Sequence, residues 1–243
     1  MESDKMNIAL IFAGGTGQRM NSRSKPKQFL ELHGKPIIIY TLEYFEDHPD
    51  IDAICIVCID GWKKKLKQLL EIYDIKKCKW LLSGGETGHD SIYNGLAAIH
   101  GKCQKEDIIL IHDGVRPMIS GELISDCISM VKKYGNAITV EKVAESIVQI
   151  DDNGKITEIP PKENMRIAKA PQGFFFRDIW EVHQKAQKDG FKAIDSSHLM
   201  NHYGKQLKTI NSTPYNIKLA TPSDYYVFRA LYEAKENQQI FGL

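Results

Sequence analysis

The residues with the clearest chemical potential form a glycine-rich loop near the start of the chain. Three glycines within residues 14–17 follow an apolar run at 7–13. Glycine lets backbone N–H groups come close to an anion or to the plane of a base. Two cations, Arg19 and Lys27, lie just beyond the glycines. Fixed cations beside such a loop suit a triphosphate whose α-phosphorus is attacked. The alternative interpretation is a glycine-rich turn with basic surface residues.

Two better-known glycine loops do not match this sequence. A dinucleotide-binding loop requires a third glycine where Met20 stands, although Asp60 supplies the acid that such a fold needs after its second strand. The phosphate loop of nucleotide hydrolases requires Gly-Lys-Ser/Thr, which does not follow here. A nicotinamide oxidoreductase and a non-catalytic nucleotide sensor stay open as alternatives. A sensor, however, would not need Arg19, Lys27 and Lys218 together.

The elements that must position this loop alternate between strands and helices. Apolar runs at 7–13, 53–59 and 107–112, with a shorter one at 79–82, predict buried parallel strands. This alternation predicts an α/β fold with a Rossmann-like, mostly parallel sheet whose ligands bind beyond the carboxyl ends of the strands. Helical patterns begin at Pro36 and at about residues 61, 90 and 121.

The alternation is interrupted after residue 137. Strand-like segments at 146–150 and 155–159 flank the turn Asp151-Asp-Asn-Gly154. We interpret residues 138–162 as an inserted β-hairpin, which is either a flap over the site or an arm for another subunit. Because an isolated hairpin is marginal in water, its isoleucines favour an arm and a homodimer. We interpret residues 1–243 as a single domain. Further helical patterns lie at 177–188, at 195–203 and from 222, and further strand-like segments lie at 137–140 and 206–210.

Composition excludes several classes of protein. The chain has 243 residues, a formal net charge of +1, and hydrophobic and charged fractions of 42% and 26%. This is ordinary globular composition, so general disorder is not expected. Without a basic excess, neither nucleic acid nor an anionic membrane is an expected partner. The polar N-terminus is unlike a secretory signal, and we expect a cytoplasmic protein.

Two further patterns resemble metal or redox sites. Cys55 and Cys58 match C-x-x-C, but on a strand their side chains point to opposite faces, so we expect core cysteines. His198 and His202 have a zinc-compatible spacing on a predicted helix, yet the glutamate of the metalloprotease motif is missing. We expect a surface helix there.

The remaining motifs follow the glycine loop in a definite order. Together with the loop, they resemble the sugar-nucleotidyltransferase fold, and within it the cytidylyltransferases that act on polyol phosphates. The resemblance covers nearly the whole chain. The motifs are Gly14-Gly-x-Gly-x-Arg-Met20, Pro26-Lys-Gln28, Gly84-Gly85 with Asp90-Ser91, His112-Asp-Gly-Val-Arg-Pro117, Ala170-Pro-Gln-Gly-Phe174, Asp195 and Asn216-Ile-Lys-Leu-Ala-Thr-Pro222.

The resemblance implies that CTP and a polyol phosphate react to give a CDP-polyol and pyrophosphate. Arg19 and Lys27 would stabilise the transition state, and Lys162 and Lys218 would position the acceptor phosphate. Mg²⁺ is expected because a triphosphate rarely reacts without one, and Asp113 is the candidate to bind it or the ribose. Family members pair through an arm, which would bring Lys162 near the neighbouring cleft. The residues expected to hold CTP are Phe12, Ala13, Gly14, Gly15, Gly84, Gly85, Asp90, Ser91 and Gly114.

Two branches of this family differ in their acceptor. One uses D-ribitol 5-phosphate, for teichoic-acid or capsule synthesis, and the other uses 2-C-methyl-D-erythritol 4-phosphate, for isoprenoid synthesis. Tyr215 and Val115 resemble the ribitol branch, so we expect CDP-ribitol or a related CDP-pentitol as product. Three departures concern the acceptor more than the chemistry. The segment 86–89 lacks an arginine, Ala170 replaces a threonine, and Lys162 replaces an arginine.

Overall fold

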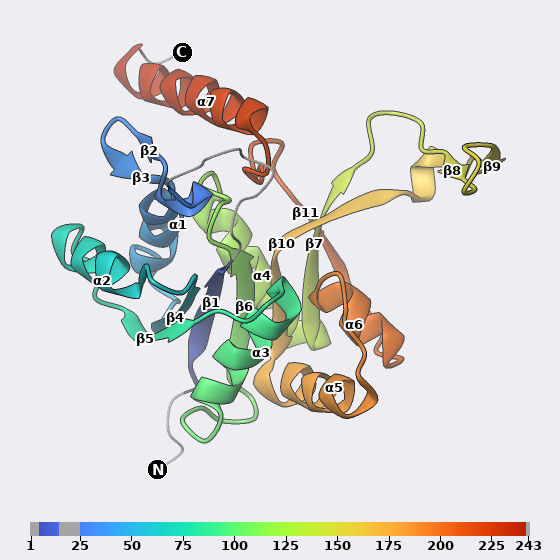
Figure 1. The fold of residues 1–243 in the computed structure, drawn as a ribbon, viewed down its shortest axis with the longest axis horizontal. Helices are drawn as coiled ribbons and strands as arrows, with labels where there is room; N and C mark the ends of the chain where they lie inside the picture. Colours follow the sequence, from blue (N-terminus) through green and yellow to red (C-terminus); the bar gives the residue numbers. More distant parts are fainter. Residues whose placement is uncertain (1–4, 15–24, 242–243) are drawn as a thin grey trace.

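The computed structural model describes residues 5–14 and 25–241 (Figure 1). At its centre lies a seven-stranded sheet in the order β11-β7-β10-β6-β1-β4-β5. β10 runs antiparallel to both of its neighbours, and the other neighbouring pairs are parallel. The expected α/β fold with a mostly parallel sheet is confirmed. The strands are β1 (Asn7–Ala13), β4 (Ala53–Cys58), β5 (Cys78–Ser83), β6 (Ile108–Asp113), β7 (Asn136–Lys142), β10 (Arg166–Phe175) and β11 (Thr209–Asn211).

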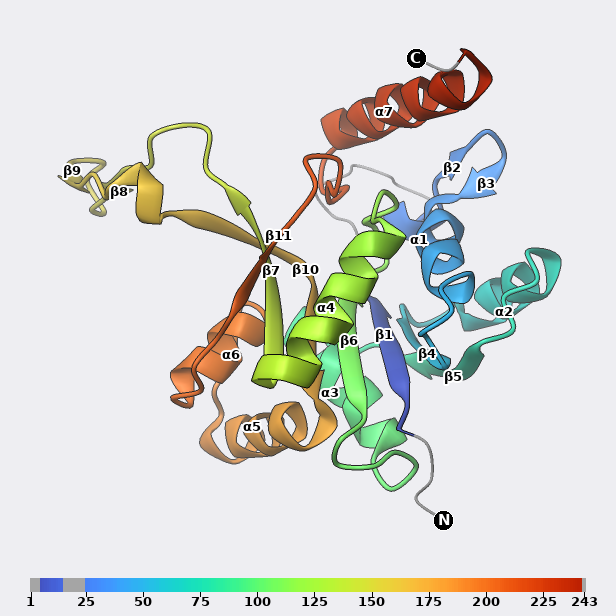
Figure 2. The same ribbon diagram turned by 180° about the vertical axis from the view of Figure 1, so that it is seen from behind.

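Helices cover both faces of the sheet, because the central strands are apolar on both sides (Figures 1 and 2). Along β1, Ala9 and Ile11 pack into one core cluster, and Ile8 and Leu10 pack into the other. α1 (Ile37–Glu46), α2 (Lys63–Ile72) and α4 (Gly121–Tyr134) close the first cluster. α3 (Gly88–Ile99), α5 (Phe176–Asp189) and α6 (Ser196–His202) close the second.

A third cluster packs the C-terminal helix against α1 and the loop after β6. α7 (Pro222–Phe241) packs beside α1 and the short strands β2 (Glu31–Leu32) and β3 (Lys35–Pro36). Phe228 meets Tyr40 edge-on, with ring centroids 5.5 Å apart. The Leu219 N–H donates to the Val115 carbonyl at 3.0 Å. This bond fixes the segment that carries Lys218 beside the loop after β6.

The sequence patterns do not predict β10, the longest strand of the sheet. Pro171 removes a ladder donor, and the register shifts between Ala168 and Gln172. Gly173 further weakens the strand pattern, yet its lack of a side chain is required. A Cβ there would lie 2.7 Å from the Cys127 Sγ atom, because α4 packs directly on the strand.

The inserted hairpin is present, with shorter strands than the patterns predict. β8 (Gln149–Ile150) and β9 (Ile156–Glu158) form it, and the 3-10 turn η3 (Lys162–Asn164) follows. Figures 1 and 2 show the hairpin extending away from the body of the molecule. Ile150 and Ile159 are 59% and 62% exposed. The hairpin therefore does not close over the cleft of its own chain as a flap would.

The cysteine and histidine patterns that resemble metal or redox sites have structural roles. Cys55 and Cys58 are fully buried on β4, and burial raises the pKa of each thiol to about 12. His202 stacks on Phe191 with centroids 3.7 Å apart, and His198 accepts the Ile194 N–H through Nδ1. Among the helices of the described residues, none combines the length and the apolar character that crossing a bilayer demands.

Candidate active site

A cavity of about 500 Å³ opens where β1 and β5 end. It is bordered by the two glycine segments, Phe12–Gly14 and Gly84–Gly85, together with Lys27 and Lys218. Ser91 and Asp113 also line it. The structure thus brings together most of the residues expected to hold CTP. Gly15 and Arg19 lie outside the described residues.

The two glycine segments come within backbone contact distance of each other. A Cβ on Gly84 would lie 3.1 Å from the Gly14 Cα atom, and a Cβ on Gly14 would lie 2.7 Å from the Ser91 Oγ atom. A Cβ on Gly85 would come within 2.4 Å of the Asp90 Cβ atom. These positions have room for glycine alone, because any side chain would separate β1 from the start of α3.

Ser91 holds this arrangement through its hydroxyl group. The hydroxyl donates to the Thr87 carbonyl at 2.9 Å and accepts the Gly85 N–H at 3.0 Å. A serine hydroxyl has one donor and two lone pairs. These two bonds leave one lone pair of Ser91 unused.

Asp90 caps α3 and does not line the cavity. Its carboxylate accepts the Thr87 N–H at 3.2 Å, and the Thr87 hydroxyl accepts the Asp90 N–H at 3.1 Å. Burial raises the pKa of this carboxyl, but the Thr87 hydrogen bonds and the nearby Lys192 ammonium outweigh it and lower the pKa. Gly114 likewise stays behind the lining, where a Cβ would lie 3.0 Å from the Ala13 Cβ atom.

Asp113 forms the electrostatic centre of the site. It is buried and bonds to Arg116 at 2.7 Å and to the Lys218 ammonium at 2.6 Å. Burial alone would raise the pKa of this carboxyl, but the two cations outweigh burial and hold it well below its usual range. Lys218 remains 41% exposed and lies 5.9 Å from the centre of the Phe12 ring. Asp113 therefore fixes a cation at the mouth of the cavity.

These residues do not form a protein-built magnesium site. Asp113 already pairs with two cations, and Mg²⁺ requires an octahedral set of oxygen ligands. Among the described residues, no group of three or more His, Cys, Asp or Glu side chains could hold a metal ion. A magnesium ion in this cavity would depend on substrate oxygens for its ligands.

The predicted cations differ in where the structure places them. Lys27 lines the cavity from the turn η2 (Lys27–Phe29), and the Gln28 side chain next to it donates to the Ala13 carbonyl at 2.6 Å. Lys162 lies on the arm, where its ammonium donates to the Ala144 carbonyl at 2.9 Å. It does not line the cavity of its own chain.

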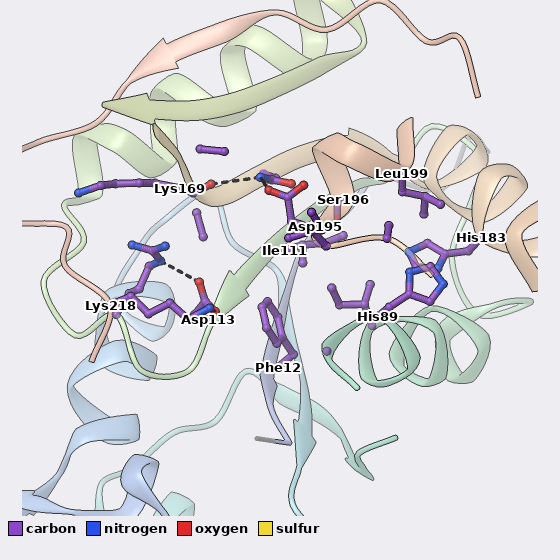
Figure 3. Close-up of a pocket in the computed structure, with 18 residues that line it drawn as sticks. Phe12, His89, Ile111, Asp113, Lys169, His183, Asp195, Ser196, Leu199 and Lys218 are labelled. Carbon is purple, nitrogen blue, oxygen red and sulfur yellow. Dashed lines mark hydrogen bonds and ion pairs between the residues drawn. The ribbon is translucent and has the colours of Figure 1, made fainter. Parts of the chain in front are cut away.

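A second cavity, of about 320 Å³, adjoins the first and was missed by the sequence patterns (Figure 3). The two share Phe12, Gly88, Asp113 and Lys218. The second cavity is additionally lined by Arg116, Lys169, Gln172, Asp195, His89, His183 and Ser196, among others.

Side chains of this second cavity come from elements far apart in the sequence. Lys169 is nearly buried, pairs with Glu141 and donates to the Asn216 carbonyl at 3.1 Å. Asp195 caps α6 by accepting the His198 N–H at 2.8 Å, and it also accepts from Gln172 at 3.1 Å. The motifs around Ala170-Pro-Gln and Asp195 were the available signals. Nothing in the sequence indicated Lys169 or His183.

Two adjoining cavities that share a fixed cation, Lys218, at the carboxyl ends of central strands and beside a glycine-lined backbone, are what a nucleotidyltransferase needs. Comparison with known proteins agrees. Residues 7–233 match the family model described as "IspD: 2-C-methyl-D-erythritol 4-phosphate cytidylyltransferase". The chain belongs to this family of cytidylyltransferases, as the sequence motifs predicted.

Individual relatives extend the match over nearly the full length. The chain is 46% identical to a ribitol-5-phosphate cytidylyltransferase of Vibrio parahaemolyticus, over 98% of the chain and 100% of the relative. It is 34% identical to a 2-C-methyl-D-erythritol 4-phosphate cytidylyltransferase of Clostridium botulinum, over 90% and 93%. A solved structure from Anaerococcus prevotii, a 4-diphosphocytidyl-2C-methyl-D-erythritol synthase, superposes with a TM-score of 0.82 at 27% identity, covering 94% of this chain and 96% of that one.

Proposed function

We propose that this protein transfers the cytidylyl group of CTP to D-ribitol 5-phosphate, or to a closely related pentitol phosphate, and releases pyrophosphate. The observation that carries the proposal is the 46% identity, over essentially both full lengths, to a ribitol-5-phosphate cytidylyltransferase. The product, CDP-ribitol, would serve teichoic-acid or capsule synthesis. Because CTP is a cytoplasmic nucleotide, we place the reaction in the cytoplasm.

The reaction needs positioning more than acid–base chemistry. A phosphate oxygen of the acceptor attacks the α-phosphorus of CTP, an O–P bond forms, and the bond to the β-phosphate breaks. A phosphate monoester is largely dianionic at neutral pH, with a second pKa of about 6, so no general base is required. Lys27 and Lys218 supply positive charge beside the reacting phosphates. Asp113 holds Lys218 in place.

The two cavities divide the substrates between them. The glycine-lined cavity takes CTP. The unused lone pair of Ser91 can accept an N–H of the cytosine amino group, whereas donating to the carbonyl of uracil would cost the bond from the hydroxyl to Thr87. The adjoining cavity takes the polyol phosphate. Lys218 and Asp113 line both cavities, so they lie where the two substrates meet.

A magnesium ion in this scheme would be held mainly by the nucleotide. The triphosphate would supply most of its ligands, in keeping with the preference of Mg²⁺ for phosphate oxygens. Among the described residues, three carboxylates line the cavity, Asp60, Glu86 and Asp113, and Asp113 is the one that belongs to the family motifs. When bound, the ion would neutralise charge on the leaving pyrophosphate.

The second candidate is transfer to 2-C-methyl-D-erythritol 4-phosphate. The match to the family model that carries this name favours it. Incubating the protein with CTP, Mg²⁺ and a panel of polyol phosphates, followed by assay of pyrophosphate, separates the two. We expect the highest kcat/KM with ribitol 5-phosphate. Preference for the methylerythritol acceptor would favour the second candidate, and CTP binding without turnover on any acceptor would indicate a nucleotide-binding protein.

We further propose that the arm, residues 138–162, joins two copies of the chain. Its isoleucines are exposed by 38% at Ile147, 59% at Ile150 and 62% at Ile159, and burying them against a second copy is favourable. Pairing would also let Lys162 reach the partner's acceptor cavity.

Replacing residues 147–159 by a short Gly-Ser turn tests the arm. By light scattering, the intact protein should be a dimer at micromolar concentration, and the shortened variant should be a monomer with little activity. A fully active monomer of the intact chain would overturn this proposal.

A further inference from the structure

Two buried histidines lie side by side at one end of the second cavity (Figure 3). His89 comes from α3 and His183 from α5, and their ring centroids are 4.8 Å apart. Their side chains are 8% and 1% exposed. Ser196, the first residue of α6, lines the same cavity and is 3% exposed.

These side chains carry polar atoms without partners among the described residues. Both ring nitrogens of His183, the His89 Nε2 atom and the Ser196 Oγ atom form no hydrogen bond there. Leaving a buried polar group unpaired costs about 1–3 kcal/mol, and most buried polar atoms in proteins are paired. Four such atoms, all on residues that line one cavity, therefore point to a ligand that supplies the missing hydrogen bonds.

The donor and acceptor pattern defines the chemistry of that ligand. Burial lowers the pKa of His183 to about 3 and also lowers the pKa of His89, so both rings are neutral at pH 7. A neutral imidazole offers one donor and one acceptor, and a serine hydroxyl offers both. Hydroxyl groups match this pattern, because each can donate and accept. A carboxylate or phosphate only accepts at this pH, an ammonium only donates, and a hydrocarbon does neither.

The position of the histidines sets which part of an acceptor they could meet. Figure 3 shows two cations of this cavity, Lys169 and Lys218, on the side away from the histidines, and Arg116 pairs with Asp113 beside Lys218. A phosphorylated acceptor would place its phosphate by these cations. Its carbon chain would then extend past Phe12 and Ile111 towards the histidines.

We propose that His89, His183 and Ser196 form a specificity subsite that binds the hydroxyl groups of the polyol farthest from its phosphate. This inference rests on the proposed function, since it assumes a polyol phosphate acceptor. The subsite selects acceptors by the length of their hydroxylated carbon chain. An acceptor too short to reach it would leave the buried nitrogens unpaired, and such sites discriminate strongly against substrates that lack the group they bind.

The test compares ribitol 5-phosphate with glycerol 3-phosphate, which lacks the far hydroxyl groups, in wild type and in His183→Leu. For the five-carbon acceptor, kcat/KM should fall about 10²-fold in the variant, and for glycerol 3-phosphate it should change by less than about threefold. The melting temperature should stay equal or rise, because an unpaired buried imidazole is replaced by an apolar group. Ser196→Ala should show the same selectivity with a smaller loss.

His100→Leu is the matched control. His100 packs against Trp180 of the same helix α5 but does not line the cavity, so both acceptors should be used as by wild type. A direct readout is the NMR signal of the His183 ring nitrogens, which should shift when ribitol 5-phosphate binds and stay in place with glycerol 3-phosphate.

Two outcomes would overturn the subsite. Equal losses on both acceptors would show that His183 acts on folding or on CTP binding. An unchanged preference for ribitol 5-phosphate over glycerol 3-phosphate would show that His183 does not contribute to acceptor specificity. Failure of wild type to use any polyol phosphate would instead reject the proposed function, and the absence of pyrophosphate release distinguishes that case.

Discussion

The two cavities meet at Asp113 and Lys218 but are built in opposite ways. The first, glycine-lined cavity, which we propose holds CTP and call the nucleotide cavity, is shaped by backbone, where glycines at 14, 84 and 85 allow two loops to touch. The second, which we propose holds the polyol phosphate and call the acceptor cavity, is shaped by side chains from α3, β10, α5 and α6. A substitution at one of these glycines forces the backbone to move, but a substitution in the second cavity can change the lining alone. Recognition of the nucleotide is therefore tied to the fold, and recognition of the acceptor can vary on the same scaffold.

The sharpest test of this contrast is the choice of nucleotide. If Ser91 accepts the amino group of cytosine, wild type should use CTP over UTP by roughly 10⁴-fold in kcat/KM, because uracil presents an acceptor where cytosine has a donor. Pyrophosphate release with each nucleotide at fixed acceptor measures the preference. Equal use of both nucleotides would contradict the assignment.

Removing a cation that lines the nucleotide cavity should lower turnover and leave folding intact. Lys27→Ala should lower kcat by roughly 10²–10³-fold, as loss of one group that stabilises transition-state charge typically does. The melting temperature should change little, because the side chain lines an open cavity. Lys64→Ala, on the exposed face of α2, is the control. Near-normal turnover of the Lys27 variant would remove this residue from the mechanism.

Asp113 links the site to acid stability. Its folded pKa is lowered, so its stabilisation is complete above the unfolded pKa of about 3.9 and is lost as the pH falls through the folded value. Asp113→Asn should lower the free energy of unfolding at pH 7 by about 3 kcal/mol, since it leaves Arg116 buried beside a neutral group. Urea unfolding at several pH values measures the difference between wild type and variant. That difference should shrink below about pH 4, and a gap that widens on acidification would contradict the argument.

The smallest expected effect is confined to the nucleotide cavity. Gly85→Ala places a Cβ 2.4 Å from the Asp90 Cβ atom, so the start of α3 must shift. CTP binding, measured by titration calorimetry, should weaken about tenfold, with a stability loss of about 1–3 kcal/mol. In Gly121→Ala, the control, the new Cβ would meet nothing closer than 3.7 Å. If both variants bind CTP like wild type, the close approach of the loops does not matter.

The sequence predicts the nucleotide cavity better than the acceptor cavity, for the same physical reason. Gly84, Gly85 and Ser91 follow one strand directly, so a local pattern contains them. Lys218 and Asp113 lie far apart in the sequence, but each belongs to one of the ordered family motifs, so both were predicted before their ion pair was seen. Among the predicted CTP residues, however, Asp90 and Gly114 lie behind the lining.

The acceptor cavity depends on contacts that no local pattern carries. His183 lies on the buried face of an amphipathic helix, where a histidine reads like any core position. Lys169 belongs to β10, whose proline and glycine conceal the strand. The alternation of strands and helices predicted the class of fold and most boundaries within a few residues. It could not show that a late strand inserts, antiparallel, between β6 and β7.

That late strand makes one mechanical unit of the arm and the acceptor cavity. β10 begins opposite the last residue of β7, with Arg166 paired to Lys142 at the root of the arm. A few residues later the same strand supplies Lys169 and Gln172 to the cavity. Binding events that are coupled through one strand obey thermodynamic reciprocity. If subunit pairing at the arm tightens acceptor binding by some factor, acceptor binding must tighten pairing by the same factor, and the dimer dissociation constant would then depend on acceptor concentration.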